Sequence, residues 1–509
     1  MTGLPDKKNP TVSPFFYIFL YALICVLPDI FVSFQQTHND FWDTYFVARH
    51  MTFCDRQTWF NPQYPIANCL FLKIIMGKFP PEIPAILANI LFGVAILIVW
   101  LSLYRKLMTK AMAFLAIVLL SLFPRFYHYV NMGGGDPAAI AFLSCGVLLI
   151  FGQLFKSEKR KYRRFFIGGM FLGFGALFRY HVLVASVFLI LCLLIVYRKN
   201  WELPLMAFTG LCCGYAPQLA VNAVTGHGFL ETQFGMMNVY DLMYGLSWYQ
   251  TGTIHFPPTI PALIGQAPLL FLGKYLGAFV LFAPDYVPAL AALLIVKDPL
   301  KQKFCLTVAL WTIAYCGFFS ATTSGRALLL PLPLSFLCAG LCAETVFKSL
   351  RKKMPVNAYH ITSIALVGIV ILVLFGKDVL FVNSRFHENR DRVAVENYLR
   401  GLGCDNVHQI FSTDFTMYFR SLPPYLPYFN GGAPRWGTYL FNEEYPEFPI
   451  SSLKDFTAEC RKRGVRFILL TDRCGMLSPS LGALYNGTEL DKGIVFRKEI
   501  ARLRIFEKI

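Results

Sequence analysis

A pair of carboxylates stands just after the first long apolar run of the chain. Asp40 and Asp43 are three residues apart in the segment NDFWDTYFVARHM, so a helix there would place both on one face. The aromatic residues around them would lower the local dielectric, which suits a general base that takes a proton from a hydroxyl or an amine. An amphipathic helix with solvated acids at a membrane surface would show the same pattern, and the spacing leaves both interpretations open.

A third carboxylate, Asp136, follows three glycines and precedes Pro137 at the start of another apolar run. Asp and Pro in these places are typical of a helix start. The three glycines need a further reason, because glycine allows close backbone approach and the free N–H groups of a helix N-terminus attract phosphate. A phosphate beside Asp136 would require an arginine or a metal ion to offset the carboxylate.

Four basic residues stand where a membrane protein disfavours them, at the outer edges of predicted spans: Arg125, Arg179, Lys274 and Arg326. A charge at mid-bilayer costs about 2.5–3.5 kcal/mol on insertion scales. A polyprenyl-phosphate head group, bound by the N–H donors of the arginine guanidinium groups, would explain their presence. Snorkelling to ordinary lipid phosphates is the alternative.

The composition makes a bilayer the expected solvent of the chain. Of 509 residues, 56% are hydrophobic and 15% charged, and the mean hydropathy is +0.50. The net charge of +17 does not indicate a nucleic-acid partner, because 20 of the 47 Lys and Arg residues fall in short segments between apolar runs. Alternation of these segments with loops poor in Lys and Arg places the basic segments in the cytoplasm.

The elements that would position the carboxylates are about eleven membrane-spanning helices. The apolar runs lie at 13–34, 82–103, 111–124, 137–155, 165–178, 181–197, 203–222, 278–296, 304–320, 327–346 and 359–376. Region 262–296 holds either one span after an interfacial helix or two spans, and the charge alternation favours one. Residues 1–376 are therefore predicted to form the membrane domain, with long external loops at 35–81 and 223–277.

The tail, residues 377–509, is predicted to be a separate soluble α/β domain outside the membrane. DRVAVENYLRGLG and SSLKDFTAECRKRG have helical periodicity, while NVHQIFST, GVRFILLTD and the last seventeen residues are typical of strands. Such alternation favours a small α/β layer.

Cysteine spacing predicts no zinc site among the 14 cysteines, although Cys54 and Cys69 in the first external loop could form a disulfide. No phosphate-binding loop or dinucleotide fingerprint is present. Asp40 and Asp136 permit a divalent cation without requiring one, so no cofactor is assigned.

In this order along the chain, the segments resemble the GT-C superfamily of lipid-linked glycosyltransferases, particularly its branch of protein O-mannosyltransferases and the aminoarabinose transferase. An acidic residue opens the first external loop of that family, and here DFWDTYFVARHM contains Asp40 nine residues before Arg49. NPQYPIANCLF stands in the place of the Pro-rich segment. GGGDP is similar to the second acidic loop, and GALFRYHVL looks like a stretch of bacterial members. The family's Asp-Glu pair reads Asp40-Phe41 here, so Asp43 remains a rival to Asp40.

The resemblance implies an all-α membrane domain that moves a sugar, with inversion, from a polyprenyl-phosphate carrier to a lipid, glycan or protein acceptor. It implies Asp40 as base, Asp43 and Asp136 as further candidate acids, and a bacterial cytoplasmic membrane with a cytoplasmic N-terminus. Arg179 and Arg326 would stabilise charge on the leaving phosphate, with Arg125 and Lys274 as further phosphate ligands. The expected substrate-binding residues are Gln63, Tyr64, Tyr180, His181, Asn238, Tyr240 and Trp248.

Two other functions fit a chain of this composition. A lipid-linked saccharide transporter should have ionisable residues at mid-span, and often shows broken helices or repeat symmetry. An O-antigen polymerase or ligase is also rich in spans and external arginines, but usually lacks a folded α/β tail. A non-catalytic membrane scaffold is a third alternative.

Overall fold

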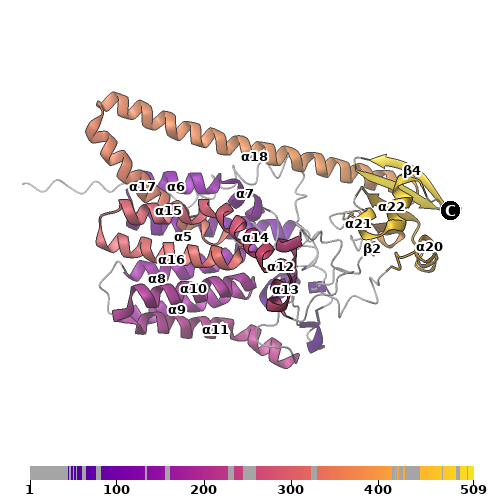
Figure 1. Cartoon of the computed structure of the whole chain (residues 1–509), viewed down its shortest axis with the longest axis horizontal. Helices are drawn as coiled ribbons and strands as arrows, with labels where there is room; N and C mark the ends of the chain where they lie inside the picture. Colours follow the sequence, from indigo (N-terminus) through magenta and orange to yellow (C-terminus); the bar gives the residue numbers. More distant parts are fainter. Residues whose placement is uncertain are drawn as a thin grey trace, which may run out of the picture.

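The protein is an α-helical bundle joined by one long helix to a small α/β domain (Figure 1). The computed structural model describes residues 44, 48–49, 51–52, 54–59, 65–75, 82–131, 135–154, 161–226, 234–244, 259–321, 329–414, 419, 421–422, 428–429, 448–472, 474–488, 493–500 and 502–509. The predicted first span, 13–34, lies outside these residues. Both parts agree with the all-α membrane domain and α/β tail expected from the sequence.

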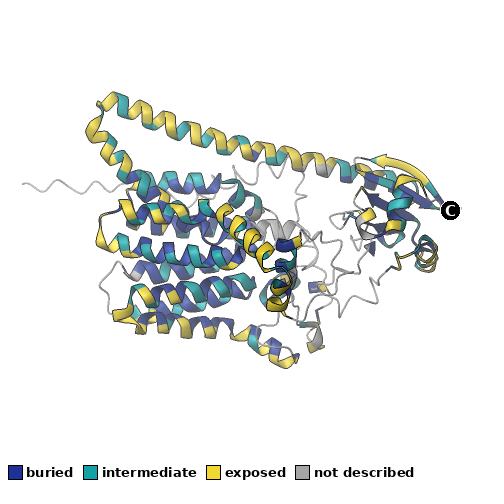
Figure 2. Ribbon diagram, in the orientation of Figure 1, coloured by how far each residue is buried: buried dark blue, intermediate teal, exposed yellow. Residues whose placement is uncertain are grey.

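The bundle contains nine of the eleven predicted apolar runs as helices, because 13–34 lies outside the described residues and 359–376 belongs to the long helix α18 (Val356–Gly401). Its helices are α5 (Glu82–Leu107), α6 (Lys110–Ser121), α8 (Asp136–Leu154), α9 (Lys161–Ala176), α10 (Tyr180–Val196), α11 (Glu202–Val224), α15 (Ala283–Ile295), α16 (Pro299–Phe319) and α17 (Leu332–Lys353). Figure 2 shows their buried faces turned toward one another. Within the described residues four helices are long and apolar enough to cross a membrane, and four shorter apolar helices accompany them. The chain is a multi-pass membrane protein.

Short helices gather at one end of this bundle. They are α4 (Ile66–Ile75), α7 (Pro124–Asn131), α12 (Phe234–Tyr244), α13 (Ile260–Gln266) and α14 (Pro268–Leu281). The α/β domain lies at the same end, which we call the domain end, whereas the turn from α17 to the next helix lies at the opposite, basic end (Figure 1). The basic end includes Arg105 and Lys106 in the last turn of α5 and Lys110 at the start of α6. It also includes Arg351, Lys352 and Lys353 at the end of α17.

Region 262–296 contains one packed apolar helix. α15 packs against α16 and α17, whereas α14 has no buried residue and bends by 104° from α13. The single span of this region stays a prediction, and its packed helix begins at Ala283 and not at 278.

Helices α9 and α11 approach so closely that their backbones touch. A Cβ atom added to Gly169 would collide with the Ala207 carbonyl oxygen, and one added to Gly210 would collide with the Phe166 carbonyl oxygen. Small residues four apart let membrane helices pack in this way, and Gly173 and Gly214 continue both rows. This contact fixes the turn between α9 and α10, which begins the candidate site.

A helix of 46 residues, α18 (Val356–Gly401), leaves the basic end and enters the α/β domain (Figure 1). Its apolar stretch Val356–Ser384 is almost entirely exposed, which a lipid environment accommodates (Figure 2). Near the domain end it contacts α7, where the Phe381 ring packs edge-on against the His128 ring at 4.3 Å between centroids. The predicted domain boundary at 376/377 falls inside this continuous helix.

The α/β domain is a five-stranded sheet in the order β2-β1-β3-β5-β4. Its strands are β1 (Ile410–Ser412), β2 (Tyr428–Phe429), β3 (Phe467–Thr471), β4 (Ile494–Ile500) and β5 (Leu503–Lys508), with helices α20 (Leu453–Lys462), α21 (Cys474–Leu477) and α22 (Pro479–Asn486). β1 pairs in parallel with β2 and β3, whereas β5 pairs antiparallel with β3 and β4. The predicted helices and strands are confirmed, and β2, α21 and α22 are additions.

The last turns of α18 belong to the core of this domain. Val395 and Leu399 are buried with Val407, Ile410 and Phe467. Across the sheet, the buried carboxylate of Glu507 accepts hydrogen bonds from Arg466 Nε and Arg497 Nε, each at 2.7 Å. The domain is therefore built onto the end of the long helix.

Candidate active site

A buried ion pair joins the first residues of α8 and α10 at the domain end of the bundle. Arg179 Nη2 donates to Asp136 Oδ2 at 2.9 Å, and the side chains are 9% and 6% exposed. Because consecutive bundle helices alternate in direction, both helices begin at the end where α7 lies. Asp136 does begin a helix as predicted, but its carboxylate also binds Arg179. A phosphate beside Asp136 would require an arginine, and Arg179 is in contact with Asp136.

Gly135 brings this pair close to two other segments of the chain. A Cβ atom at Gly135 would lie 2.8 Å from Asn68 Oδ1 and 2.9 Å from the Phe178 carbonyl oxygen. The predicted close backbone approach is confirmed at this glycine, and Gly133 and Gly134 lie outside the described residues. Asn68 Nδ2 donates to Thr44 Oγ1 at 3.4 Å, and both residues are buried. Thr44 is therefore linked through Asn68 to Gly135, next to the Asp136–Arg179 pair.

Helix α4 is held in place by hydrogen bonds that it donates to α11 and to the turn after α9. Its first N–H, at Ile66, donates to Gln218 Oε1 at 2.7 Å, and the next, at Ala67, donates to the Leu177 carbonyl oxygen at 3.1 Å. Gln218 is buried and donates in turn to Asn222 Oδ1 at 2.8 Å. These contacts satisfy N–H groups that a helix start leaves without intrahelical partners, and they fix Asn68.

A second ion pair lies at the same end. Arg125 Nη1 on α7 donates to Asp285 Oδ1 on α15 at 2.7 Å, with side-chain exposures of 23% and 2%. Ser335 on α17 donates its hydroxyl to the Asp285 carbonyl oxygen. Sequence reasoning missed Asp285, although an acidic residue in an otherwise apolar helix needs a partner and was a detectable signal.

The other predicted substrate-binding and phosphate-binding residues that the structure describes lie on α10, α12 and α14. Tyr180 and His181 are half-buried in the first turn of α10, and the His181 ring packs edge-on to Phe319 at 6.4 Å between centroids. Asn238 and Tyr240 lie on α12, where Tyr240 packs on Tyr244 with ring centroids 4.7 Å apart. Lys274 is exposed on α14.

Several predicted site residues lie outside the described part of the chain. They are Asp40, Asp43, Gln63, Tyr64, Trp248 and Arg326. Sequence neighbours of two of them are described: Thr44 follows Asp43, and Pro65 follows Tyr64. Asn68 and Gln218, which sequence reasoning did not select, are the polar residues that join these neighbours to the bundle.

The described residues contain no group of three His, Cys, Asp or Glu side chains placed to hold a metal ion. Cys54 is exposed and Cys69 is buried, and both are free thiols, so the disulfide considered for this loop is not formed.

The sequence matches one protein-family model over part of its length. Residues 64–216 match the model of dolichyl-phosphate-mannose-protein mannosyltransferases. This stretch contains α4 to α10, and with them Asn68, Asp136 and Arg179. Among curated protein sequences, none matches the chain.

The fold is similar to those of two solved proteins, ArnT and AglB. ArnT from Cupriavidus metallidurans bound to undecaprenyl phosphate has a TM-score of 0.60 at 13% identity, with 98% of this chain and 99% of that chain covered. Apo ArnT gives 0.56 at 13% identity, covering 97% and 98%. The archaeal oligosaccharyltransferase AglB from Archaeoglobus fulgidus, with an inhibitory peptide and a dolichol-phosphate, gives 0.51 at 12% identity, covering 91% and 70%.

The family match and the fold confirm the resemblance drawn from the sequence. Residues 64–216 therefore match a mannosyltransferase family model, and the chain has a fold similar to that of ArnT.

Proposed function

We propose that the protein transfers a sugar from a polyprenyl-phosphate carrier to a lipid, glycan or protein acceptor at the domain end of the bundle, with inversion. The observation that carries this proposal is the buried Asp136–Arg179 pair, held at 2.9 Å where α8 and α10 begin. It combines a carboxylate and a guanidinium in the part of the chain that matches the mannosyltransferase model. A fold similar to ArnT bound to undecaprenyl phosphate supports the choice of donor.

The proposed reaction is a single displacement at the anomeric carbon. The acceptor oxygen or nitrogen forms the new bond, the bond from that carbon to the phosphate oxygen breaks, and the carrier phosphate leaves with the bonding electrons. Asp40, or its rival Asp43, takes the acceptor proton. Arg179 and Arg326 stabilise the negative charge that develops on the leaving phosphate. The contact of Thr44 with Asn68 supports placing the first external segment beside Arg179.

Purified protein in proteoliposomes tests this proposal with a panel of synthetic polyprenyl-phosphate sugars. We expect release of polyprenyl phosphate coupled to acceptor glycosylation, with the opposite anomeric configuration in the product. Asp40→Asn should reduce turnover by at least about a hundredfold, the typical contribution of a general base. Arg105→Gln, at the basic end, is the matched control and should retain wild-type turnover. Full turnover in both Asp40→Asn and Asp43→Asn would exclude a base in this segment.

The same proteoliposomes separate transfer from transport. A lipid-linked saccharide transporter would move the intact carrier between leaflets without cleaving the sugar phosphate bond. Addition of a chelator tests whether the two candidate acids, Asp40 and Asp136, act with a divalent cation, since loss of turnover that Mg²⁺ or Mn²⁺ restores would identify a metal requirement.

We further propose that the domain end faces away from the cytoplasm, in a bacterial cytoplasmic membrane. The basic segments at the opposite end support this orientation, because positive loops stay in the cytoplasm. Reporter fusions within 223–277 and after residue 402 should give extracytoplasmic signal. Cytoplasmic signal from both positions would reverse the proposed orientation.

A further inference from the structure

One buried carboxylate on the long helix α18 has no partner in the described part of the chain. Six Asp and Glu side chains are buried there, and one of them is Asp378, a residue that is 5% exposed and whose two carboxylate oxygens accept no hydrogen bond. The other five have partners that the chain supplies: Asp136 with Arg179, Asp285 with Arg125, Glu344 with Lys348, Glu396 with Ser421, and Glu507 with Arg466 and Arg497.

Asp378 lies on the side of α18 that meets the bundle. Phe381, three residues further on, packs edge-on against the Tyr127 and His128 rings of α7. Residues three apart are neighbours on a helix surface, so Asp378 is one turn away from this contact. Val379 and Leu380 beside it are exposed. The buried carboxylate therefore lies at the edge of an apolar surface that lipid would cover.

The position of Asp378 along α18 places it near the head groups of one leaflet. The apolar stretch Val356–Ser384 has 29 residues, which at about 1.5 Å per residue extend roughly 44 Å. That length matches a bilayer together with its head groups. Asp378 precedes Ser384 by six residues, about 9 Å along the helix axis. It is thus close to the boundary between hydrocarbon and head groups on the side of the domain end.

An ionised carboxylate in such a place is costly unless a positive charge and hydrogen-bond donors accompany it. A primary ammonium group supplies a positive charge and three N–H donors, whereas a quaternary ammonium group supplies no donor. A lipid carries its head-group amine near this depth, and its acyl chains would lie along the exposed apolar side chains of α18. A lipid with a primary amine therefore fits the charge, the depth and the apolar surroundings of Asp378.

We propose that α18 and α7 form a binding site for a membrane lipid with a primary ammonium head group, and that Asp378 binds the ammonium. This site is additional to the proposed sugar transfer and does not depend on it. The competing explanation is a protonated, neutral carboxyl group that binds nothing.

The purified protein in detergent tests this site by native mass spectrometry, in titrations with phosphatidylethanolamine and with phosphatidylcholine of the same acyl chains. Wild type should bind phosphatidylethanolamine at least about tenfold more tightly, because the choline head group has no N–H to donate to the carboxylate. The matched variant combines Asp378→Asn with Asn383→Asp. It moves the carboxylate to an exposed position on the same helix at unchanged net charge, and it should bind the two lipids with Kd values within about twofold of each other.

The variant Asp378→Leu separates the two explanations. Its unfolding temperature in detergent without added lipid should equal or exceed that of wild type, because leucine replaces a buried polar group that has no partner. Added phosphatidylethanolamine should raise the unfolding temperature of wild type and not that of Asp378→Leu, since a ligand stabilises only the protein that binds it. Asn383→Asp alone is the control and should respond as wild type does. A carboxyl group that binds nothing predicts the same response in all three proteins.

Equal Kd values of wild type for the two lipids would overturn this assignment. So would a preference for phosphatidylethanolamine that survives in the double variant. Free ethanolamine is the last comparison: if it binds wild type as tightly as the lipid does, the site recognises a soluble amine, and the assignment to a lipid is overturned. None of these results changes the expected sugar transfer, which the proteoliposome assay measures separately.

Discussion

Asp136 and Arg179 depend on each other because both are removed from water at the end of an apolar bundle. Removing one partner of such a pair leaves a buried charge and costs about 3–5 kcal/mol, more than the pair itself contributes. We therefore expect Arg179→Met to lower the free energy of unfolding by about that amount. Denaturant titration in detergent, with Arg105→Gln as control, measures the difference. A loss below about 1 kcal/mol would mean that water reaches Asp136.

The thiols of the α/β domain allow a second prediction at this scale. Burial raises the pKa of Cys460 and of Cys474 to about 12, and neither side chain is exposed. At pH 8 the thiolate fraction of each is on the order of 10⁻⁴, so alkylating reagents should modify neither in the native protein. Cys54 is exposed and should react first. Mass spectrometry of the alkylated protein would contradict this if Cys474 reacted as fast as Cys54 before denaturation.

Single residues could be predicted from sequence only where their type was unusual for their place. Asp136, Arg125 and Arg179 stood out as charges at the edges of apolar runs, and all three form ion pairs, of which the Asp136–Arg179 pair is buried. Their partners could not be assigned, because Arg179 is 43 residues from Asp136 and Arg125 is 160 from Asp285. Asn68 and Gln218 are ordinary polar residues in helices, and only the contacts of α4 with α11 and with the turn after α9 give them a role.

At the scale of helices, the contact between α9 and α11 is the most sensitive feature. Gly210→Ala would place a methyl group against the Phe166 carbonyl oxygen, and neither backbone can move without shifting its helix. We expect a loss of about 1–3 kcal/mol, typical of overpacking. Gly368→Ala on α18 is the matched control, since no atom lies within 4 Å of a Cβ there, and it should not destabilise. Thermal unfolding in detergent compares the two, and equal midpoints would contradict the close packing.

Long apolar helices were predictable because their length and composition leave few alternatives in a membrane. The ends of these helices were harder to predict. α17 begins at Leu332 and not at 327, and α15 begins at Ala283 and not at 278. The short helices α7, α12 and α13 were not predicted, because neither length nor periodicity distinguishes them from loops. They matter nonetheless, since α7 carries Arg125 and contacts α18.

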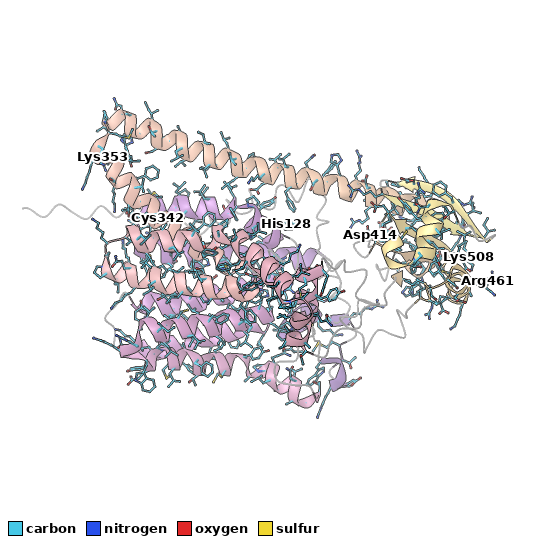
Figure 3. All side chains as sticks on the ribbon, in the orientation of Figure 1. His128, Cys342, Lys353, Asp414, Arg461 and Lys508 are labelled. Atoms are coloured by element: carbon cyan, nitrogen blue, oxygen red, sulfur yellow. The ribbon has the colours of Figure 1, made fainter. Side chains whose placement is uncertain are left out.

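At the scale of the whole molecule, α18 determines where the α/β domain can lie. At about 1.5 Å per residue its 46 residues extend roughly 69 Å, from the basic end past α7 to the sheet. Figure 3 shows Asp414, at the carboxyl end of β1, on the side of the domain that faces the bundle, and Arg461 and Lys508 on the far side. The carboxyl ends of β1 and of its parallel neighbour β3 are thus on the side of the domain that faces the bundle.

Insertions into α18 test whether this orientation matters for catalysis. One alanine added after Ser384 would rotate the domain by about 100°, whereas seven added residues return it to within about 20° of its original direction. We expect the one-residue insertion to lower transfer to a macromolecular acceptor more than the seven-residue insertion does. Transfer rates of the two variants, normalised to folded protein, give the comparison. Equal losses would show that the direction of the domain does not decide transfer.

Helix α18 is continuous and belongs to the core of the α/β domain at Val395 and Leu399. This limits how the length of the helix can vary. Additions and deletions in the exposed stretch of α18 are tolerable only in steps near whole turns, three or four residues and then seven. Natural versions of this chain should therefore differ in the length of this helix by such steps, because other steps would turn the domain away from its present direction around the helix axis.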